Sequence, residues 1–211
     1  MIQKGLIVSC QAEANSAFNN PHSIVNFAKE AERGGAVGVR IKGINNIKSV
    51  YDEISIPIIG LTKTHFSDGS VWITSSHLDV EKIKNSGAQY IASDATGRGG
   101  YKNLKSICKN NNIIGDISDI SQAKKALECG CIALATSLNG YTPSCNVNMD
   151  SPNFELLEDL VKLFPQVPII AEGRFWERDQ VKKAFDIGAH NVVVGTAITR
   201  PHLIVMRLRG Y

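Results

Sequence analysis

Polar or ionisable residues close nearly every short apolar run in this sequence. In chain order they are Gln11, Arg40, Lys63, Asp94, Asp116, Ser137, Glu172 and the pair Gly195-Thr196. One polar residue after a strand carries little information, but a ring of them that converges on one mouth is difficult to explain by solubility alone. Glu172 lies between Ala171 and Gly173, where burial is expected, and a buried carboxyl group needs a partner or a function.

Each of these residues also has a purely structural explanation. Gln11 and Asp116 could cap the helices that follow them. Arg40 and Asp94 could form an ion pair, and Lys63 could be a solvated loop residue. These alternatives stay open at the level of sequence.

The elements that would position these residues alternate along the chain. Eight short β-branched runs recur, at 5–10, 36–41, 56–62, 89–94, 112–117, 131–137, 168–173 and 191–197. They are continuously apolar, which is typical of parallel strands covered on both faces. Helical segments lie between them at 23–33, 79–86, 119–129 and 177–187, and each is followed by a glycine that can end it.

Eight repeats of strand and helix predict an α/β fold, a single (β/α)8 TIM barrel that spans residues 1–211. An open doubly wound sheet is the rival fold, and its nucleotide-binding fingerprint would be a glycine-rich turn after the first strand. The first strand here runs into Ser9, Cys10, Gln11 and Ala12, which form no such turn. Because the active sites of these barrels lie at the C-terminal ends of the strands, the ring of polar residues is expected at one mouth.

The loops after the last two strands suit a phosphate group. Gly173 and Arg174 follow the seventh run, and Gly195-Thr196 opens the segment that leads to Arg200. Loops seven and eight often bind phosphate in this fold. Glycines let backbone N–H groups approach the oxygens, and an arginine adds a bidentate fork. Tight turns without a ligand are the structural alternative.

Composition narrows the class of protein further. Charged residues make up 20% and hydrophobic residues 43%, which argues against disorder, and the net charge is only +3. That charge is too small for a concentrated nucleic-acid-binding face or a polybasic membrane binder. No apolar run reaches the length of a membrane helix or a signal peptide, so we expect a cytoplasmic protein.

The five cysteines form no C-x-x-C pair and leave no second ligand cluster. They are Cys10, Cys108, Cys129, Cys131 and Cys145. We expect reduced, structural thiols and no metal site.

Six motifs in register resemble the N-acetylmannosamine-6-phosphate 2-epimerase family. They are 5–11 (GLIVSCQ), 34–40 (GGAVGVR), 94–96 (DAT), 140–142 (GYT), 171–173 (AEG) and 197–201 (AITRP), and the resemblance extends from residue 5 to about residue 205. It implies interconversion of N-acetylmannosamine 6-phosphate and N-acetylglucosamine 6-phosphate in amino sugar and sialic acid breakdown. It also implies that the enzyme needs no cofactor and forms a homodimer.

The resemblance also assigns roles to individual residues. Lys63 would be the catalytic base and Glu172 its acidic counterpart. The expected substrate contacts are Gln11, Arg40, Asp94 and Asp116, and the expected phosphate contacts are Gly173, Arg174, Gly195, Thr196 and Arg200.

Such a reaction removes the C2 proton of the open-chain sugar and returns a proton to the opposite face. Strands three and seven of an eight-stranded barrel face each other, which would place Lys63 opposite Glu172. Burial and a neighbouring cation such as Arg40 would lower the pKa of Lys63. A Schiff-base aldolase or lyase that uses Lys63 and a non-catalytic sugar-phosphate binder are the rival functions.

Overall fold

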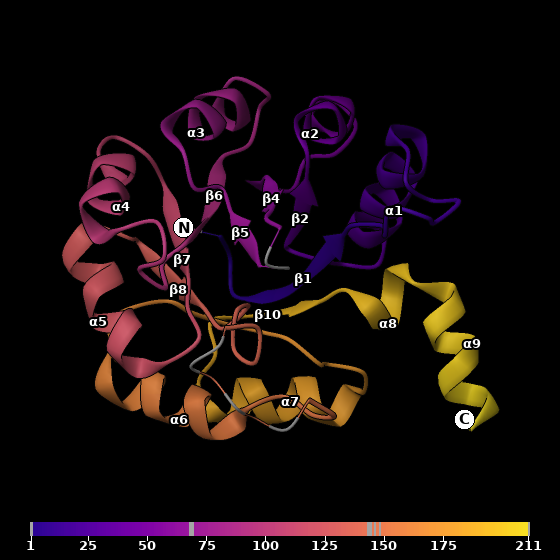
Figure 1. The fold of residues 1–211 in the computed structure, drawn as a ribbon. Helices are drawn as coiled ribbons and strands as arrows, with labels where there is room; N and C mark the ends of the chain where they lie inside the picture. Colours follow the sequence, from indigo (N-terminus) through magenta and orange to yellow (C-terminus); the bar gives the residue numbers. More distant parts are fainter. Residues whose placement is uncertain (1, 68–69, 143–144, 146, 148, 211) are drawn as a thin grey trace.

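The computed structural model describes residues 2–67, 70–142, 145, 147 and 149–210, and it confirms the predicted barrel. Eight parallel strands close in the order β1-β10-β9-β8-β7-β6-β3-β2 (Figure 1). Their bounds are β1 Gly5–Cys10, β2 Gly38–Lys42, β3 Ile58–Leu61, β6 Tyr90–Asp94, β7 Ile113–Asp116, β8 Ala133–Ala135, β9 Ile169–Glu172 and β10 Asn191–Val194. All eight predicted apolar runs are therefore strands, with ends shifted by a few residues.

Helices surround the barrel on its outer side (Figure 1). They are α1 Pro21–Arg33, α2 Ile44–Tyr51, α3 His77–Lys84, α4 Tyr101–Cys108, α5 Ile120–Cys129, α6 Phe154–Leu163, α7 Arg178–Ile187, α8 Thr196–Thr199 and α9 Pro201–Arg209. The four helices expected from glycine stops correspond to α1, α3, α5 and α7. The helices α2, α4, α6, α8 and α9 were not predicted, and the first four of them do not end at a glycine.

The helix caps differ from the sequence-based alternatives. Asn20 caps α1 and accepts a hydrogen bond from the Ser23 backbone N–H at 2.9 Å. Asp119 caps α5 by accepting from the Gln122 N–H at 3.0 Å. The suggestion that Gln11 and Asp116 cap these helices is therefore wrong, because a cap must sit directly before the first turn.

Two apolar layers hold the barrel together. Small and branched side chains such as Ile7, Ile59, Ile114 and Val193 fill its interior. A second cluster packs the outer faces of the strands against the helices. A filled interior is rigid, so ligand can enter only at the mouth.

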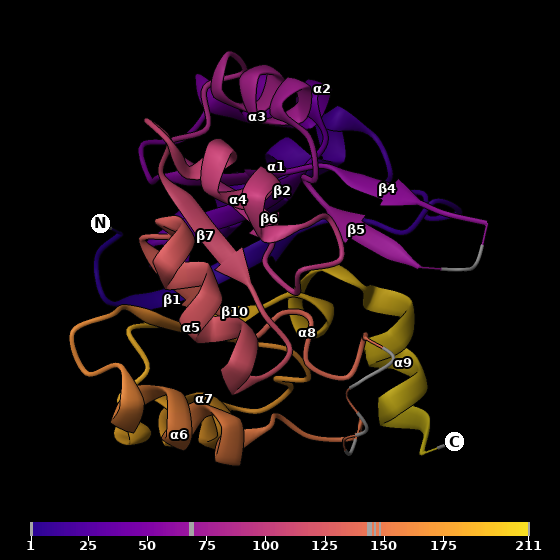
Figure 2. The same ribbon diagram turned by 60° about the vertical axis from the view of Figure 1, so that its left-hand side comes forward.

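One addition to the barrel was not predicted. After β3, the chain forms a two-stranded antiparallel hairpin from β4 (Lys63–His65) and β5 (Val71–Ile73). Figure 2 shows this hairpin projecting beyond the ends of the barrel strands. Lys63 therefore begins a hairpin strand instead of ending a barrel strand.

Within the described residues, no helix is both long and apolar enough to cross a membrane.

Candidate functional site

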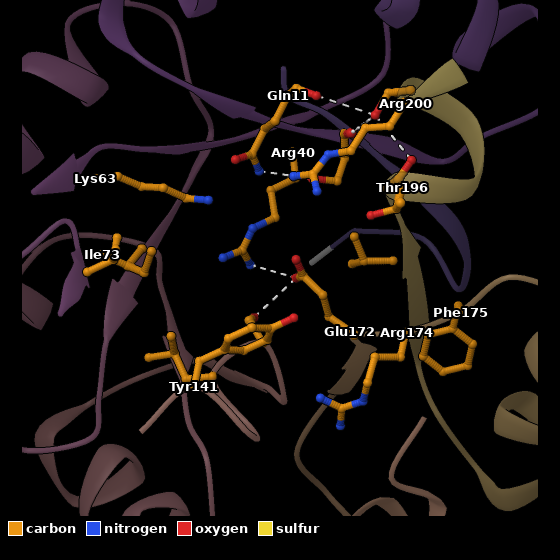
Figure 3. Close-up of a pocket in the computed structure, with 18 of the residues that line it drawn as sticks. Gln11, Arg40, Lys63, Ile73, Tyr141, Glu172, Arg174, Phe175, Thr196 and Arg200 are labelled. Carbon is orange, nitrogen blue, oxygen red and sulfur yellow. Dashed lines mark hydrogen bonds and ion pairs between the residues drawn. The ribbon is translucent and has the colours of Figure 1, made fainter. Parts of the chain in front are cut away.

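A cavity of about 600 Å³ opens at the C-terminal mouth of the barrel. Nine of the predicted site residues line it: Gln11, Arg40, Lys63, Glu172, Gly173, Arg174, Gly195, Thr196 and Arg200. The volume lies in the usual range for small-molecule sites, roughly 300–1,000 Å³. Figure 3 shows Lys63 entering from the hairpin side, with Arg40 and Glu172 in front of it.

Arg40 on β2 organises the deepest part of the cavity. Its side chain is only 3% exposed, and its two terminal nitrogens donate to the two carboxylate oxygens of Asp116 at 3.1 and 2.5 Å. The Nη1 atom also lies 3.0 Å from Oε2 of Glu172. Burial alone would lower the pKa of Arg40, but the two carboxylates outweigh it and raise that pKa. The suggested Arg40–Asp94 ion pair is therefore wrong, because Arg40 already pairs with two other carboxylates.

Glu172 ends β9 and is fixed from two sides. The Ser137 hydroxyl donates to its Oε2 at 3.1 Å, and its backbone N–H donates to the Thr136 hydroxyl at 2.9 Å. Burial raises the pKa of Glu172, and the neighbouring Asp116 raises it further, while Arg40, the Ser137 hydroxyl and Lys63 oppose the shift. A raised pKa brings the protonated form of this carboxyl group closer to neutral pH, which suits a proton donor.

The Lys63 amine faces this group of charges. Burial, followed by the charge of Arg40, lowers its pKa to about 8, and Glu172 opposes the shift. These are the two causes that the sequence predicted. A lysine in this state is neutral for part of the time at physiological pH, as a base or a nucleophile requires.

The four charges balance one another. Lys63 and Arg40 contribute two positive charges, and Asp116 and Glu172 contribute two negative ones. A proton that leaves Lys63 would leave a net negative charge in a buried site, which favours protonation of a carboxyl group. The arrangement therefore suits a site in which base and acid exchange protons through a ligand.

The other end of the cavity is more polar and more open. Gln11 donates to the Ser9 hydroxyl at 2.9 Å, and Arg200, between α8 and α9, pairs with Glu13 at 3.1 Å. The Arg200 side chain is 32% exposed. Gly173 has φ +116, and a Cβ there would strain the backbone although the space beside it is open.

Three of the predicted site residues do not direct their side chains into the centre of the cavity. Asp116 is fully buried behind Arg40 and does not line the cavity. Asp94, at the end of β6, lies outside the cavity and pairs with Arg98. Arg174 lines the cavity, but its Nη1 donates to the Asn139 carbonyl at 2.8 Å, and in Figure 3 its guanidinium points away from Arg40 and Glu172.

The cavity also contains residues that the sequence-based prediction did not name as site residues. They are Ser9, His65, Ser70, Val71, Ile73, Ser137, Leu138, Tyr141, Phe175, Trp176, Val193 and Thr199. Ser137 follows the sixth apolar run, so the strand-end rule that found Lys63 had already singled it out, and Tyr141 lies in the motif at 140–142. His65, Val71 and Ile73 come from the hairpin, for which the sequence offers no equally clear signal.

All five cysteines are free thiols, as predicted. In the described part of the chain, no three His, Cys, Asp or Glu side chains gather as a metal-binding group.

The fold and the cavity together define a (β/α)8-barrel enzyme whose cavity is lined by a lysine, an arginine and a glutamate, with a buried aspartate paired to the arginine. The family model described as "Putative N-acetylmannosamine-6-phosphate epimerase" matches residues 24–210. The chain belongs to this family, which confirms the resemblance seen in the sequence.

Individual relatives of this chain carry the name of the same family. A protein of Clostridioides difficile (strain 630) named "Putative N-acetylmannosamine-6-phosphate 2-epimerase" is 39% identical, over 94% of this chain and 92% of its own. A relative of the same name in Caldanaerobacter subterraneus is also 39% identical, over 98% of this chain and 90% of its own. The solved N-acetylmannosamine-6-phosphate 2-epimerase of Clostridium perfringens superimposes with a TM-score of 0.91 at 34% identity, covering 99% of this chain and 93% of that one.

Proposed function

We propose that this protein interconverts N-acetylmannosamine 6-phosphate and N-acetylglucosamine 6-phosphate by moving a proton at C2 of the sugar. The observation that carries the proposal is the pairing of a lysine of lowered pKa with an arginine and a carboxyl group of raised pKa in one cavity. Family membership supplies the substrate class.

The first step uses Lys63 as the base. In the open-chain sugar the C2–H bond is adjacent to the C1 carbonyl. The neutral amine takes the C2 proton, the C–H electron pair forms a C1–C2 double bond, and the carbonyl oxygen becomes an enolate oxygen. Arg40 is the cation with the strongest effect on Lys63, and it stabilises this developing charge.

The second step returns a proton to the opposite face. Lys63 follows β3 and Glu172 ends β9, and these strands are four apart in the eight-stranded barrel. Glu172 in its protonated form supplies the proton to C2, and the enolate returns to the carbonyl. In the reverse reaction the roles are exchanged: ionised Glu172 removes the C2 proton, and protonated Lys63 returns one to the other face.

The phosphate lies at the open end of the cavity. Arg200 is the side chain that adds charge there, and the backbone at Gly173, Gly195 and Thr196 approaches the oxygens. Gln11 binds a sugar hydroxyl beside them. Arg174, whose Nε donates to the Ser151 carbonyl at 2.8 Å, orients the loop that borders the phosphate.

Proton NMR of N-acetylmannosamine 6-phosphate in D2O tests the proposal directly. The expected result is growth of the N-acetylglucosamine 6-phosphate signals together with loss of the C2 proton signal. The absence of both with purified protein would overturn the proposed function.

A Schiff-base enzyme is the second candidate, because a lysine of lowered pKa is also a nucleophile. Borohydride with substrate separates the two, since it reduces an imine to a stable adduct. The epimerase leaves the protein mass unchanged, whereas a Schiff-base enzyme gains the mass of the sugar on Lys63.

We further propose that the protein works in the cytoplasm as a homodimer without a cofactor. Light scattering at micromolar concentration tests the dimer, for which a mass close to twice 22.9 kDa is expected.

A further inference from the structure

Arg98 lies outside the cavity, in the loop that follows β6. Its side chain is 18% exposed and forms an ion pair with Asp94. Asp94 is itself held, because its Oδ1 accepts from the Thr96 N–H at 3.0 Å and from the Thr96 hydroxyl at 2.6 Å. Arg98 Nε donates to the same hydroxyl at 3.0 Å. The guanidinium therefore has a fixed position on the barrel.

From this position Arg98 reaches the hairpin that carries Lys63. Its Nη2 donates to the Val71 carbonyl at 3.2 Å, and its guanidinium carbon lies 5.8 Å from the centre of the Trp72 ring. Val71 and Ile73 on β5 also line the cavity, and Ile73 is paired with Lys63 across the hairpin.

The base of the hairpin is attached separately. The Ser93 hydroxyl donates to the Thr74 carbonyl at 2.9 Å, and Thr74 exchanges hydrogen bonds with Thr62 at 3.0 and 3.2 Å. Through Val71 and Trp72, Arg98 thus ties the outer part of the hairpin, which encloses the lysine, to the loop after β6.

We propose that Arg98 is a positioning residue that, anchored by Asp94, clamps the β4–β5 hairpin against the loop after β6 and so keeps Lys63 enclosed and directed at Arg40 and Glu172. This inference rests on the proposed function, and it gives Asp94 a role through the hairpin instead of through the substrate.

The clamp has a measurable signature in pH. Burial is the largest cause of the lowered Lys63 pKa, so a loosened hairpin returns that pKa toward 10.5. Each unit by which the Lys63 pKa rises reduces the neutral fraction of this amine at pH 7 about tenfold. The proposed phosphate contacts Gly195, Thr196 and Arg200 lie at the end of β10 and around α8 and are not part of the hairpin, so KM should change little.

Direct electrostatics must be separated from positioning. Among the described residues, the charges that shift Lys63 are those of Arg40, Glu172, Lys42 and Arg200, and His65 is the titratable neighbour on its own strand. Arg98 is not one of these charges, but removing it alone would change the net charge of the protein by one unit. The double variant Asp94→Asn/Arg98→Gln removes the clamp and leaves the net charge unchanged.

The experiment measures kcat and KM from pH 6 to 10 for Arg98→Ala, Arg98→Lys and the charge-neutral double variant. We expect Arg98→Ala and the double variant to lower kcat at pH 7 about tenfold, with KM within threefold and most of the loss recovered at pH 9.5. Arg98→Lys should fall between them and the unmodified protein. Ile24→Val, a buried change on α1 far from the hairpin, is the control and should keep the original pH profile.

Unchanged kcat and pH profile in all three variants would overturn the clamp, as would a loss that is equal at every pH. Trp72 gives a readout independent of turnover, because the chain has only two tryptophans. In a Trp176→Phe background, Arg98→Gln should make Trp72 more accessible to acrylamide, and unchanged quenching would contradict the clamp. If the unmodified protein failed to exchange the C2 proton, the proposed function would fail while the Trp72 measurement still tested the clamp.

Discussion

The two ends of the cavity are built in different ways. At the deep end, Arg40 is 3% exposed and pairs with Asp116 and Glu172 on two other barrel strands. At the open end, Arg200 is 32% exposed and pairs with Glu13, which is itself 44% exposed. The deep charges are fixed by the sheet, whereas the outer charge lies on the connection between two C-terminal helices.

This difference predicts a division of labour. Buried, fixed charges cost desolvation, but they need no rearrangement when charge develops in a reaction. Exposed charges are screened and are less costly to rearrange, which suits the capture of an anion from water. Changes at the deep end should therefore act on kcat, and changes at the open end should act on KM.

Lys63→Ala should have the largest effect of all. It removes the proposed base, so we expect loss of both epimerisation and C2 exchange, by at least about 10³-fold. The measurement is NMR in D2O, with substrate binding by calorimetry as the control. Full activity in this variant would eliminate the mechanism.

Glu172→Gln should have the second largest effect, with turnover about 10²-fold lower than in the unmodified protein. The amide keeps the size but lacks the charge and the labile proton. If Glu172 serves only the second face, deuterium still enters one epimer while little of the other forms. If it also tunes Lys63, exchange and turnover fall together, and wild-type rates of both would exclude it from catalysis.

Arg200→Ala tests the open end of the cavity, and its effect should appear in KM instead of kcat. A lost hydrogen bond to a charged group costs about 1.5 kcal/mol at a partly exposed site, which is roughly tenfold in KM. Steady-state kinetics with the 6-phosphate measures this, and the unphosphorylated sugar should be a poor substrate for both proteins. A decrease in kcat with unchanged KM would reverse the proposed assignment of the two ends.

The pH dependence should report mainly the deep end, because burial and Arg40 are the two largest causes of the lowered Lys63 pKa. The first step, removal of the C2 proton, needs neutral Lys63, so the rate of C2 proton exchange in D2O should rise with pH until the pKa of about 8 is passed. From pH 7 to pH 8 the neutral fraction rises about fivefold, and the rate should follow it. The midpoint of this limb is the observable, and a rate that falls over this interval would contradict Lys63 as the base.

Treatment with EDTA should leave the epimerase activity unchanged. Both ends of the cavity act through amine, guanidinium, carboxyl and backbone groups. Activity after exhaustive dialysis is the measurement, and a loss restored only by a divalent ion would refute the metal-independent mechanism.

The sequence predicted the barrel because its signal is local and repeated. Each apolar run between 5–10 and 191–197 reads as a buried strand on its own, and eight such runs specify the closed sheet. The short helices α2 and α4 carry weaker signals, since they lack the glycine stop that marks α5 and α7.

The strand-end rule located most of the cavity for the same reason. Residues that close the apolar runs of a parallel barrel must lie near one mouth, so Arg40, Lys63 and Glu172 could be grouped from the sequence alone, although Lys63 begins the hairpin after β3 and does not end a barrel strand. What the rule cannot supply is the direction and partner of a side chain.

Those partners were decided by the tertiary structure. Asp94 and Asp116 end neighbouring strands and look equivalent in sequence, yet one pairs with Arg98 toward the hairpin and the other with Arg40 in the core. Side-chain direction depends on the stagger of the closed barrel, and ion pairs join residues as far apart as 40 and 116. The sequence by itself therefore determined which residues reach the mouth, and only the packed barrel decided which of them face the cavity.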